Sequence, residues 1–185
     1  MAHIKLPDGI PGIVGPMTAY PETERHLSGL AEALLRGESS LTPAERELIA
    51  TAVSSGNECV FCTQSHAAAS RALYGEGEAC KIVDQVLQDP KAAPVSDKMR
   101  ALLTIAEKVR QDGRLVQDED VANARAAGAD DKAIHDTVLI AAAFCMYNRY
   151  VDGLATWAPR DPEVYRVMGE RLATNGYIKP QEALR

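Results

Sequence analysis

Apolar residues recur at spacings of three and four along most of the chain, and stretches of strict apolar–polar alternation are absent. This period is that of an amphipathic α-helix rather than that of a β-strand. Ala, Leu, Glu and Arg, which favour helices, are abundant, and prolines and glycines separate the periodic segments. The pattern therefore predicts an all-α fold in which each helix buries one apolar stripe.

The proline and glycine positions also predict how the chain is organised. Residues 1–20 hold three prolines and three glycines and are expected to form an extended arm, laid over the surface or over a neighbouring subunit. Residues 21–185 are expected to form a single domain, since a chain of this length can bury one core. The expected helices outside the motif region are 21–36, 78–88, 96–111, 117–127, 131–156 and 161–174.

One pair of consecutive helices has unusually clear boundaries. Thr42 is the expected N-cap of the first helix, a proline follows it, and Glu45 can close a capping box. Gly56 and Asn57 end this helix. The next helix is expected to begin at residue 58 or 59, with Asn57 as its cap, and to end at residue 75. Because the connection is short, the two helices are expected to fold back as an antiparallel hairpin.

The second helix of this hairpin begins with a Cys-x-x-Cys pair, Cys59 and Cys62. The free N–H groups and the positive dipole end of a helix N-terminus stabilise a thiolate. Two cysteines in a first turn can also close a disulfide with modest adjustment. Four cysteines do not make a disulfide scaffold in a chain of this size, so the close pair indicates redox or metal chemistry. Cys80 and Cys145 are isolated and expected to be structural.

His66 and Glu47 extend the pattern. His66 lies four residues after Cys62, where its imidazole can exchange a proton with the thiol near neutral pH. Glu47 precedes the interhelical turn by about as many residues as His66 follows it. At 1.5 Å per residue, the two side chains are expected to meet about 13–14 Å from the turn. Glu47 can then orient and charge His66, as the third group of a nucleophile triad does.

A zinc site is the alternative use of these residues. On paper, its ligands would be the two cysteines, His66 and Glu47. Structural zinc sites, however, usually take their ligand pairs from loops and turns rather than from helices. No metal and no cofactor is therefore expected, and the chain has no nucleotide or flavin motif.

The charge and hydropathy of the chain argue against several classes of partner. A net charge of −6 and a pI near 5.3 leave no basic surface for nucleic acid or for an anionic membrane. The longest nearly unbroken apolar stretch, 138–147, is much shorter than the roughly 20 residues of a membrane span. The first ten residues contain one lysine, no apolar run and two helix breakers. We therefore expect no signal peptide and a cytoplasmic location.

Residues 41–66 resemble the alkylhydroperoxidase D-like (AhpD-like) family within the carboxymuconolactone decarboxylase superfamily, and are most similar to its peroxidase-related branch. The similarity extends through 126–128 to 148–149. The resemblance implies a helical domain of about seven to eight helices, with a central antiparallel hairpin that carries the Cys-x-x-Cys motif. The family signature is Glu, eleven residues, Cys-x-x-Cys, three residues and His, which this chain meets at Glu47, Cys59, Cys62 and His66.

The resemblance also implies a function and partners. It implies a homo-oligomer, commonly a trimer or hexamer, that reduces organic hydroperoxides with the cysteine pair and is regenerated by an external dithiol or a dithiol-bearing protein. In the family's peroxidases the second cysteine attacks and the first resolves, which here means Cys62 and Cys59. Helix electrostatics alone favour Cys59 as the more acidic thiol.

The chain departs from the family at Phe61. The well-studied peroxidases often have a histidine directly before the second cysteine, so a proton relay through that imidazole cannot operate here, which points to a low peroxidase rate. Phe61 is expected either to shape an apolar approach for an organic hydroperoxide or to be part of the core. Asn148 and Arg149, which close the long apolar helix, are expected to hold its C-terminal end.

Two other functions remain open for the same residues. A redox-sensing or binding protein would close its cysteine pair under oxidation and would consume peroxide stoichiometrically. A decarboxylase- or isomerase-type enzyme would instead use His66 and Glu47 as acid and base on a small organic acid. Its activity would survive replacement of both Cys59 and Cys62 by serine.

Overall fold

The computed structural model describes residues 1–178, which contain nine α-helices, one short 3₁₀-helix and no strand. The predicted all-α fold is therefore confirmed. In this part of the chain, none of the helices combines the length and apolar character needed to cross a membrane. The elements are α1 Val14–Ala19, α2 Pro21–Leu35, α3 Pro43–Gly56, α4 Val60–Tyr74, α5 Glu78–Gln88, α6 Asp97–Gln111, η1 Gly113–Leu115, α7 Asp118–Ala126, α8 Asp131–Gly153 and α9 Pro162–Asn175.

The helix ends follow local signals in the sequence. The predicted capping box of α3 is present: Thr42 Oγ1 accepts from the N–H of Glu45 at 3.2 Å, and Glu45 Oε2 accepts from the N–H of Thr42 at 2.8 Å. The side chains of Ser96, Asp130 and Asp161 cap α6, α8 and α9 by accepting a hydrogen bond from a backbone N–H in the first turn. The largest difference in a predicted boundary is at α8, which ends at Gly153 rather than at residue 156.

The N-terminal segment is not extended throughout, because Val14–Ala19 forms the short helix α1. Pro16 lies in its first turn, where a backbone N–H has no helical acceptor and proline is tolerated. The residues before α1 contact the turn that follows α8. The N–H of His3 donates to the carbonyl of Leu154 at 3.0 Å, and the N–H of Gly12 donates to that of Trp157 at 2.9 Å.

The turn between α3 and α4 also differs from the prediction, because Asn57 ends α3 and does not cap α4. The N–H of Cys59 donates to the carbonyl of Ser54 at 3.1 Å, and the N–H of Glu58 donates to that of Ser55 at 2.9 Å. Glu58 adopts a left-handed conformation, with φ of 60°. This turn satisfies the last carbonyls of α3 and leaves Cys59 as the N-cap of α4.

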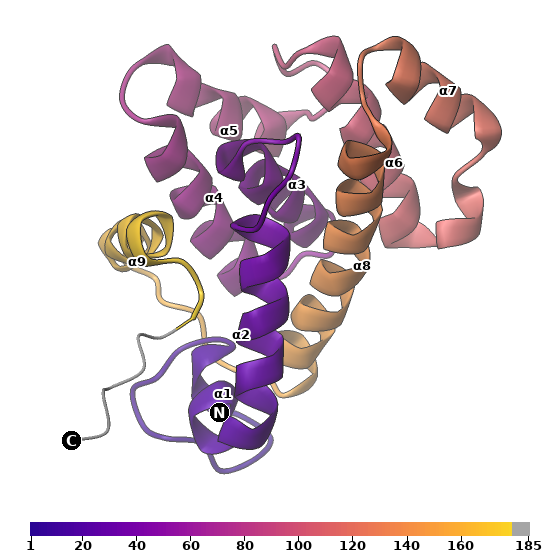
Figure 1. Cartoon of the computed structure of the whole chain (residues 1–185). Helices are drawn as coiled ribbons and strands as arrows, with labels where there is room; N and C mark the ends of the chain where they lie inside the picture. The colour runs from indigo at the N-terminus through magenta and orange to yellow at the C-terminus, as the bar shows by residue number, and fades with distance from the viewer. Residues whose placement is uncertain (179–185) are drawn as a thin grey trace.

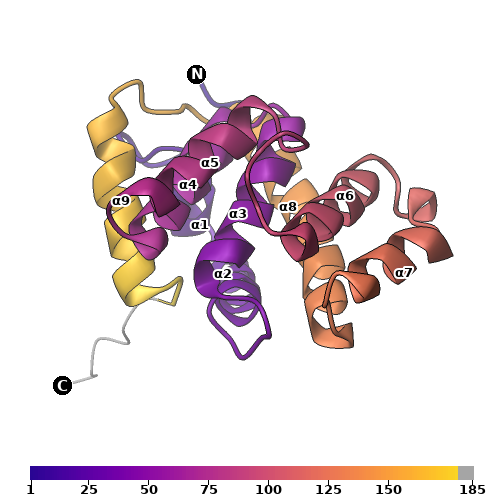
Figure 2. The ribbon, with the colours of Figure 1, turned by 90° about the horizontal axis from the view of Figure 1, so that it is seen from above.

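Helix α3 occupies the centre of the molecule and packs against α4, α6 and α8. Figures 1 and 2 show α9 at one edge and α7 at the opposite edge, with α2 and α3 between them. α3 and α4 form the predicted central hairpin, and α4 also packs along α9. The apolar core lies where these helices meet, and its fully buried side chains include Leu35, Leu48, Ile49, Leu102, Ile105, Ile140 and Phe144.

Gly169 permits the close approach of α9 to α4. A Cβ at this position would lie 2.6 Å from the Cβ of Ala68 and 2.5 Å from its carbonyl carbon. Gly169→Ala is therefore expected to push the helices apart and to lower the free energy of unfolding by about 1–3 kcal/mol. Urea unfolding followed by circular dichroism measures this change.

Gly29→Ala is the matched control for this prediction. Gly29 is also a helical glycine, but a Cβ there would meet no atom within 4 Å. Alanine at this position is expected to raise the free energy of unfolding by about 0.5–1 kcal/mol, because it restricts the unfolded chain and favours the helix. Equal effects of the two substitutions would contradict the close packing of α4 on α9.

Candidate active site

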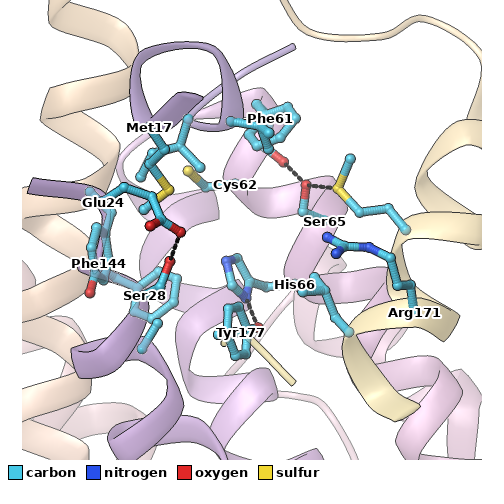
Figure 3. Close-up of a pocket in the computed structure, with 16 residues that line it drawn as sticks. Met17, Glu24, Ser28, Phe61, Cys62, Ser65, His66, Phe144, Arg171 and Tyr177 are labelled. Atoms are coloured by element: carbon cyan, nitrogen blue, oxygen red, sulfur yellow. Dashed lines mark hydrogen bonds between the residues drawn. The ribbon is translucent and has the colours of Figure 1, made fainter. Parts of the chain in front are cut away.

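A partly enclosed cavity of about 120 Å³ lies between α2, α4, α8 and α9. Cys62 and His66, on one face of α4, point toward it, and Figure 3 shows them near Met17 of α1. Polar side chains at its walls include Glu24, Ser28, Ser65 and Arg171. The rest of the lining is largely apolar and includes Ile13, Met17, Ala31, Phe61, Phe144, Met168 and Leu172.

Glu47 and His66 meet as the hairpin geometry predicted. The Nδ1 atom of His66 lies 2.7 Å from Oε2 of Glu47, which is completely buried. Burial opposes ionisation of this carboxyl group, but His66 and Arg36 outweigh it, and the pKa of Glu47 is lowered. Because an ionised carboxylate can only accept, the shared proton is assigned to Nδ1. In the neutral imidazole, Nε2 is then a free acceptor on the ring edge that faces the cavity (Figure 3).

Arg36 and Tyr177 also hold Glu47, and neither was identified from the sequence. Arg36, directly after α2, places Nη2 2.7 Å from Oε1 of Glu47. The hydroxyl of Tyr177, beyond the end of α9, lies 2.6 Å from the same oxygen. An arginine after a helix and a tyrosine outside any motif carry no sequence signal for such a role.

The two cysteines of the Cys-x-x-Cys motif lie close together, as predicted. Cys59 and Cys62 approach within 3.4 Å of each other, and both are free thiols in the structure. Cys59 is fully buried in a small apolar cluster that includes Val151 and Tyr165, whereas Cys62 lines the cavity. At this separation a disulfide can form with a small adjustment of the first turn of α4.

The two thiols differ in acidity. The hydrogen bond from the Cys62 thiol lowers the pKa of Cys59 and outweighs burial, and the backbone N–H of Cys62 adds to the effect. The pKa of Cys62 is raised, first because it donates this hydrogen bond and then because it is buried. Cys59 is therefore the more acidic thiol of the pair, as helix electrostatics favoured. The thiol that faces the cavity is Cys62.

Asn148 connects the end of α3 with the cysteine pair. Its Oδ1 accepts from Nδ2 of Asn57 at 2.9 Å, and its Nδ2 donates to Oγ of Ser54 at 3.0 Å. The buried amide also faces Cys62 and lowers the pKa of that thiol, against the larger opposing effects. The sequence suggested only that Asn148 holds the end of α8. In the structure it also contacts the cysteine pair.

Phe61 is both a buried residue and a wall of the cavity. Its ring centroid lies 6.2 Å from that of Tyr165. On another side, a Cβ on Gly12 would lie 2.2 Å from the Phe61 ring, so the N-terminal segment rests directly on the aromatic side chain. The two roles expected for Phe61, apolar approach and core, are combined in one residue.

The charged and sulfur-bearing residues do not converge on one metal position. Among residues 1–178, no group of three or more His, Cys, Asp or Glu side chains is placed to hold a metal ion. Glu47 and His66 bond to each other, and the cysteines contact each other in a separate apolar cluster. The site instead offers a thiol at a cavity, a second thiol beside it, and an imidazole oriented by a carboxylate.

Solved structures share this fold. An uncharacterised peroxidase-related protein from Ralstonia eutropha JMP134, described as an alkylhydroperoxidase AhpD core, is 26% identical, with a TM-score of 0.76 over 87% of this chain and 82% of its own. A second uncharacterised peroxidase-related protein, from Silicibacter sp. TM1040, is 28% identical, with a TM-score of 0.73 over 82% of this chain and 78% of its own. A protein of unknown function from Agrobacterium tumefaciens, 23% identical, shares the fold, with a TM-score of 0.66 over 81% of this chain and 99% of its own.

The sequence itself matches a family profile. No curated protein matches it significantly. Residues 21–108, which include the Glu47, Cys59, Cys62 and His66 positions, match the profile of the Carboxymuconolactone decarboxylase family. This match and the fold shared with peroxidase-related proteins agree with each other, and together they support the assignment of the chain to the AhpD-like carboxymuconolactone decarboxylase superfamily.

Proposed function

We propose that the protein is a thiol-dependent peroxidase that reduces organic hydroperoxides through Cys59 and Cys62. The observation that carries this proposal is that one apolar cavity is lined by both a thiol and an oriented imidazole, while a second thiol lies 3.4 Å from the first. The apolar lining suits an organic hydroperoxide. The similarity to proteins described as peroxidase-related supports an antioxidant role.

In the first step, Cys62 transfers its thiol proton to Nε2 of His66, directly or through one water, while Nδ1–H stays bound to Glu47. The thiolate then attacks the terminal oxygen of the hydroperoxide. An S–O bond forms, the O–O bond breaks, and the departing alkoxide takes the proton from His66 to become an alcohol. Cys62 is left as a sulfenic acid.

In the second step, Cys59 attacks the sulfur of the Cys62 sulfenic acid. The S–S bond forms, the S–O bond breaks, and the hydroxyl group leaves with the proton of the Cys59 thiol as water. Cys59 attacks as its thiolate, because the thiolate is the nucleophile. In sum, two thiols and one hydroperoxide give one disulfide, one alcohol and one water.

The proposed partners follow from this chemistry. The disulfide must be reopened by an external dithiol, either a small molecule or one carried by a protein, through thiol–disulfide exchange. We also propose a homo-oligomer, a trimer or hexamer. Exposed apolar side chains at Val60, Trp157 and Val167 support a contact between copies.

A free-thiol count tests the proposed function. With one equivalent of an organic hydroperoxide, the wild type is expected to lose two of its four cysteine thiols and to turn over repeatedly when a dithiol is supplied. Stoichiometric consumption without turnover would indicate a redox sensor instead. An unchanged thiol count would contradict the peroxidase. Acid–base activity that survives in a variant with both Cys59 and Cys62 replaced by serine would indicate a decarboxylase-type enzyme.

A further inference from the structure

Tyr177 is a half-buried residue outside every motif of the chain, yet it contacts several members of the site. Its hydroxyl lies 2.6 Å from Oε1 of Glu47 and 3.2 Å from Nδ1 of His66. Its ring stacks on the imidazole, with centroids 6.0 Å apart and planes inclined by 13°. The guanidinium of Arg36 lies over the same ring, 5.2 Å from its centroid. Figure 3 shows the phenol directly beneath His66.

The backbone brings Tyr177 to this position through a turn that requires glycine. Gly176 has φ of 69°, and a Cβ there would lie 2.4 Å from Oε2 of Glu32. The same carboxylate oxygen accepts a hydrogen bond from the N–H of Tyr177 at 2.6 Å. The turn after α9 is therefore docked on α2, and this docking sets the height of the phenol beside His66.

The phenol determines how the Glu47 carboxylate is oriented. Burial and the charge of Glu47 raise the pKa of Tyr177 well above its ordinary value, so the hydroxyl keeps its proton and donates. Tyr177 and Arg36 both donate to Oε1, which leaves Oε2 for Nδ1 of His66. The terminal torsion of a glutamate is intrinsically broad, so donors on one oxygen are needed to hold the other in place.

We propose that Tyr177 is a positioning residue of the site: by holding Oε1 of Glu47, it keeps Oε2 on Nδ1 of His66 and thus presents Nε2 to the cavity. The kinetic consequence rests on the proposed peroxidase function, whereas the position of the proton on His66 can be measured without turnover. Replacing Tyr177 by phenylalanine removes no charged group from the site. The charged side chains around it are Arg36, Glu32, Glu24 and Arg171.

Tyr177→Phe tests the proposal, because it removes the hydroxyl and keeps the stacked ring. Tyr74→Phe is the matched control: Tyr74, the last residue of α4, is partly buried against the apolar core and does not line the cavity. ¹⁵N NMR of the His66 ring, identified by its loss in His66→Gln, is expected to show the Nδ1–H tautomer in the wild type and in the control. Tyr177→Phe is expected to show a mixture of tautomers.

Kinetics give a second readout of the same variants. The rate of hydroperoxide-dependent thiol loss is expected to fall about tenfold in Tyr177→Phe, because a misplaced base loses its alignment. Tyr74→Phe is expected to keep the rate of the wild type.

Gly176→Ala provides an independent test that keeps the hydroxyl but displaces the turn from Glu32. It is expected to give the same tautomer mixture, and it keeps the test decisive if Tyr177→Phe does not fold. A wild-type tautomer and rate in folded Tyr177→Phe would overturn the positioning role and leave the peroxidase proposal intact. If the wild type loses no thiols, the peroxidase proposal fails, and the tautomer alone decides the role of Tyr177.

Discussion

Replacing Cys62 by serine is expected to abolish the hydroperoxide-dependent loss of thiols, because Cys62 is the thiol that lines the cavity with His66. The second-order rate constant is expected to fall by on the order of 10³-fold or more, since the proposed nucleophile is removed. In Cys59→Ser, attack is expected to continue but to stop at the sulfenic acid. Mass spectrometry after trapping with a dione measures that product.

Cys80→Ser and Cys145→Ser are the matched controls for this prediction. Both cysteines are partly buried free thiols outside the close pair, and both variants are expected to react at the wild-type rate. A sulfenic acid at Cys59 in the Cys62→Ser variant would reverse the proposed roles and show that the more acidic thiol attacks. If no sulfenic acid forms in either Cys59→Ser or Cys62→Ser, the mechanism is contradicted.

Glu47→Gln is expected to lower the free energy of unfolding by about 3–5 kcal/mol, since it leaves a buried charge without its partner. The Arg36 side chain is 12% exposed and lies 2.7 Å from Oε1 of the completely buried Glu47. Glutamine keeps the shape of the side chain but removes the charge that compensates the guanidinium. Urea unfolding at neutral pH measures the loss.

The control for this effect is an exposed ion pair. Glu163 and Arg166 also form a salt bridge, but their side chains are 58% and 55% exposed. Glu163→Gln is therefore expected to change the free energy of unfolding by only about 0–1 kcal/mol. Similar losses in Glu47→Gln and Glu163→Gln would show that Arg36 does not depend on its buried partner.

The same carboxylate is expected to make the stability of the protein sensitive to acid. The pKa of Glu47 is lower in the folded protein than its ordinary value of 4.5. The stability that comes from its ionisation is thus fully present above that value and is lost as the pH falls through the lowered, folded-state pKa. Below pH 4.5, the wild type is expected to lose more stability than Glu47→Gln, and parallel pH curves would contradict this.

Much of the central hairpin could be predicted because its signals act over a few residues. The capping box at Thr42 and Glu45 specified where α3 begins, and helix-breaking residues marked most other ends. The contact between Glu47 and His66 followed from the register of an antiparallel hairpin, since residues equally far from the turn lie at the same depth.

Other parts of the site depend on contacts that the sequence does not mark. Arg36 and Tyr177 are separated from Glu47 by 11 and 130 positions, and neither lies at a motif spacing. The prediction that Asn57 caps α4 was wrong because the cap depends on a backbone conformation that the sequence does not indicate. The left-handed conformation of Glu58 ends α3 and places Cys59 at the N-cap, and a glutamate gives no sign of that conformation.

The sequence by itself determined the helical fold, the hairpin and the residues of the cysteine, histidine and glutamate motif, because helix periodicity, capping and motif spacing are local interactions. Only the tertiary structure decided that Cys62 rather than Cys59 faces the cavity, and that a phenol from beyond α9 holds Glu47. Those features arise where α2, α4 and α9 pack together, and the exposure or hydrogen bonding of a side chain there is set by neighbours remote in the chain.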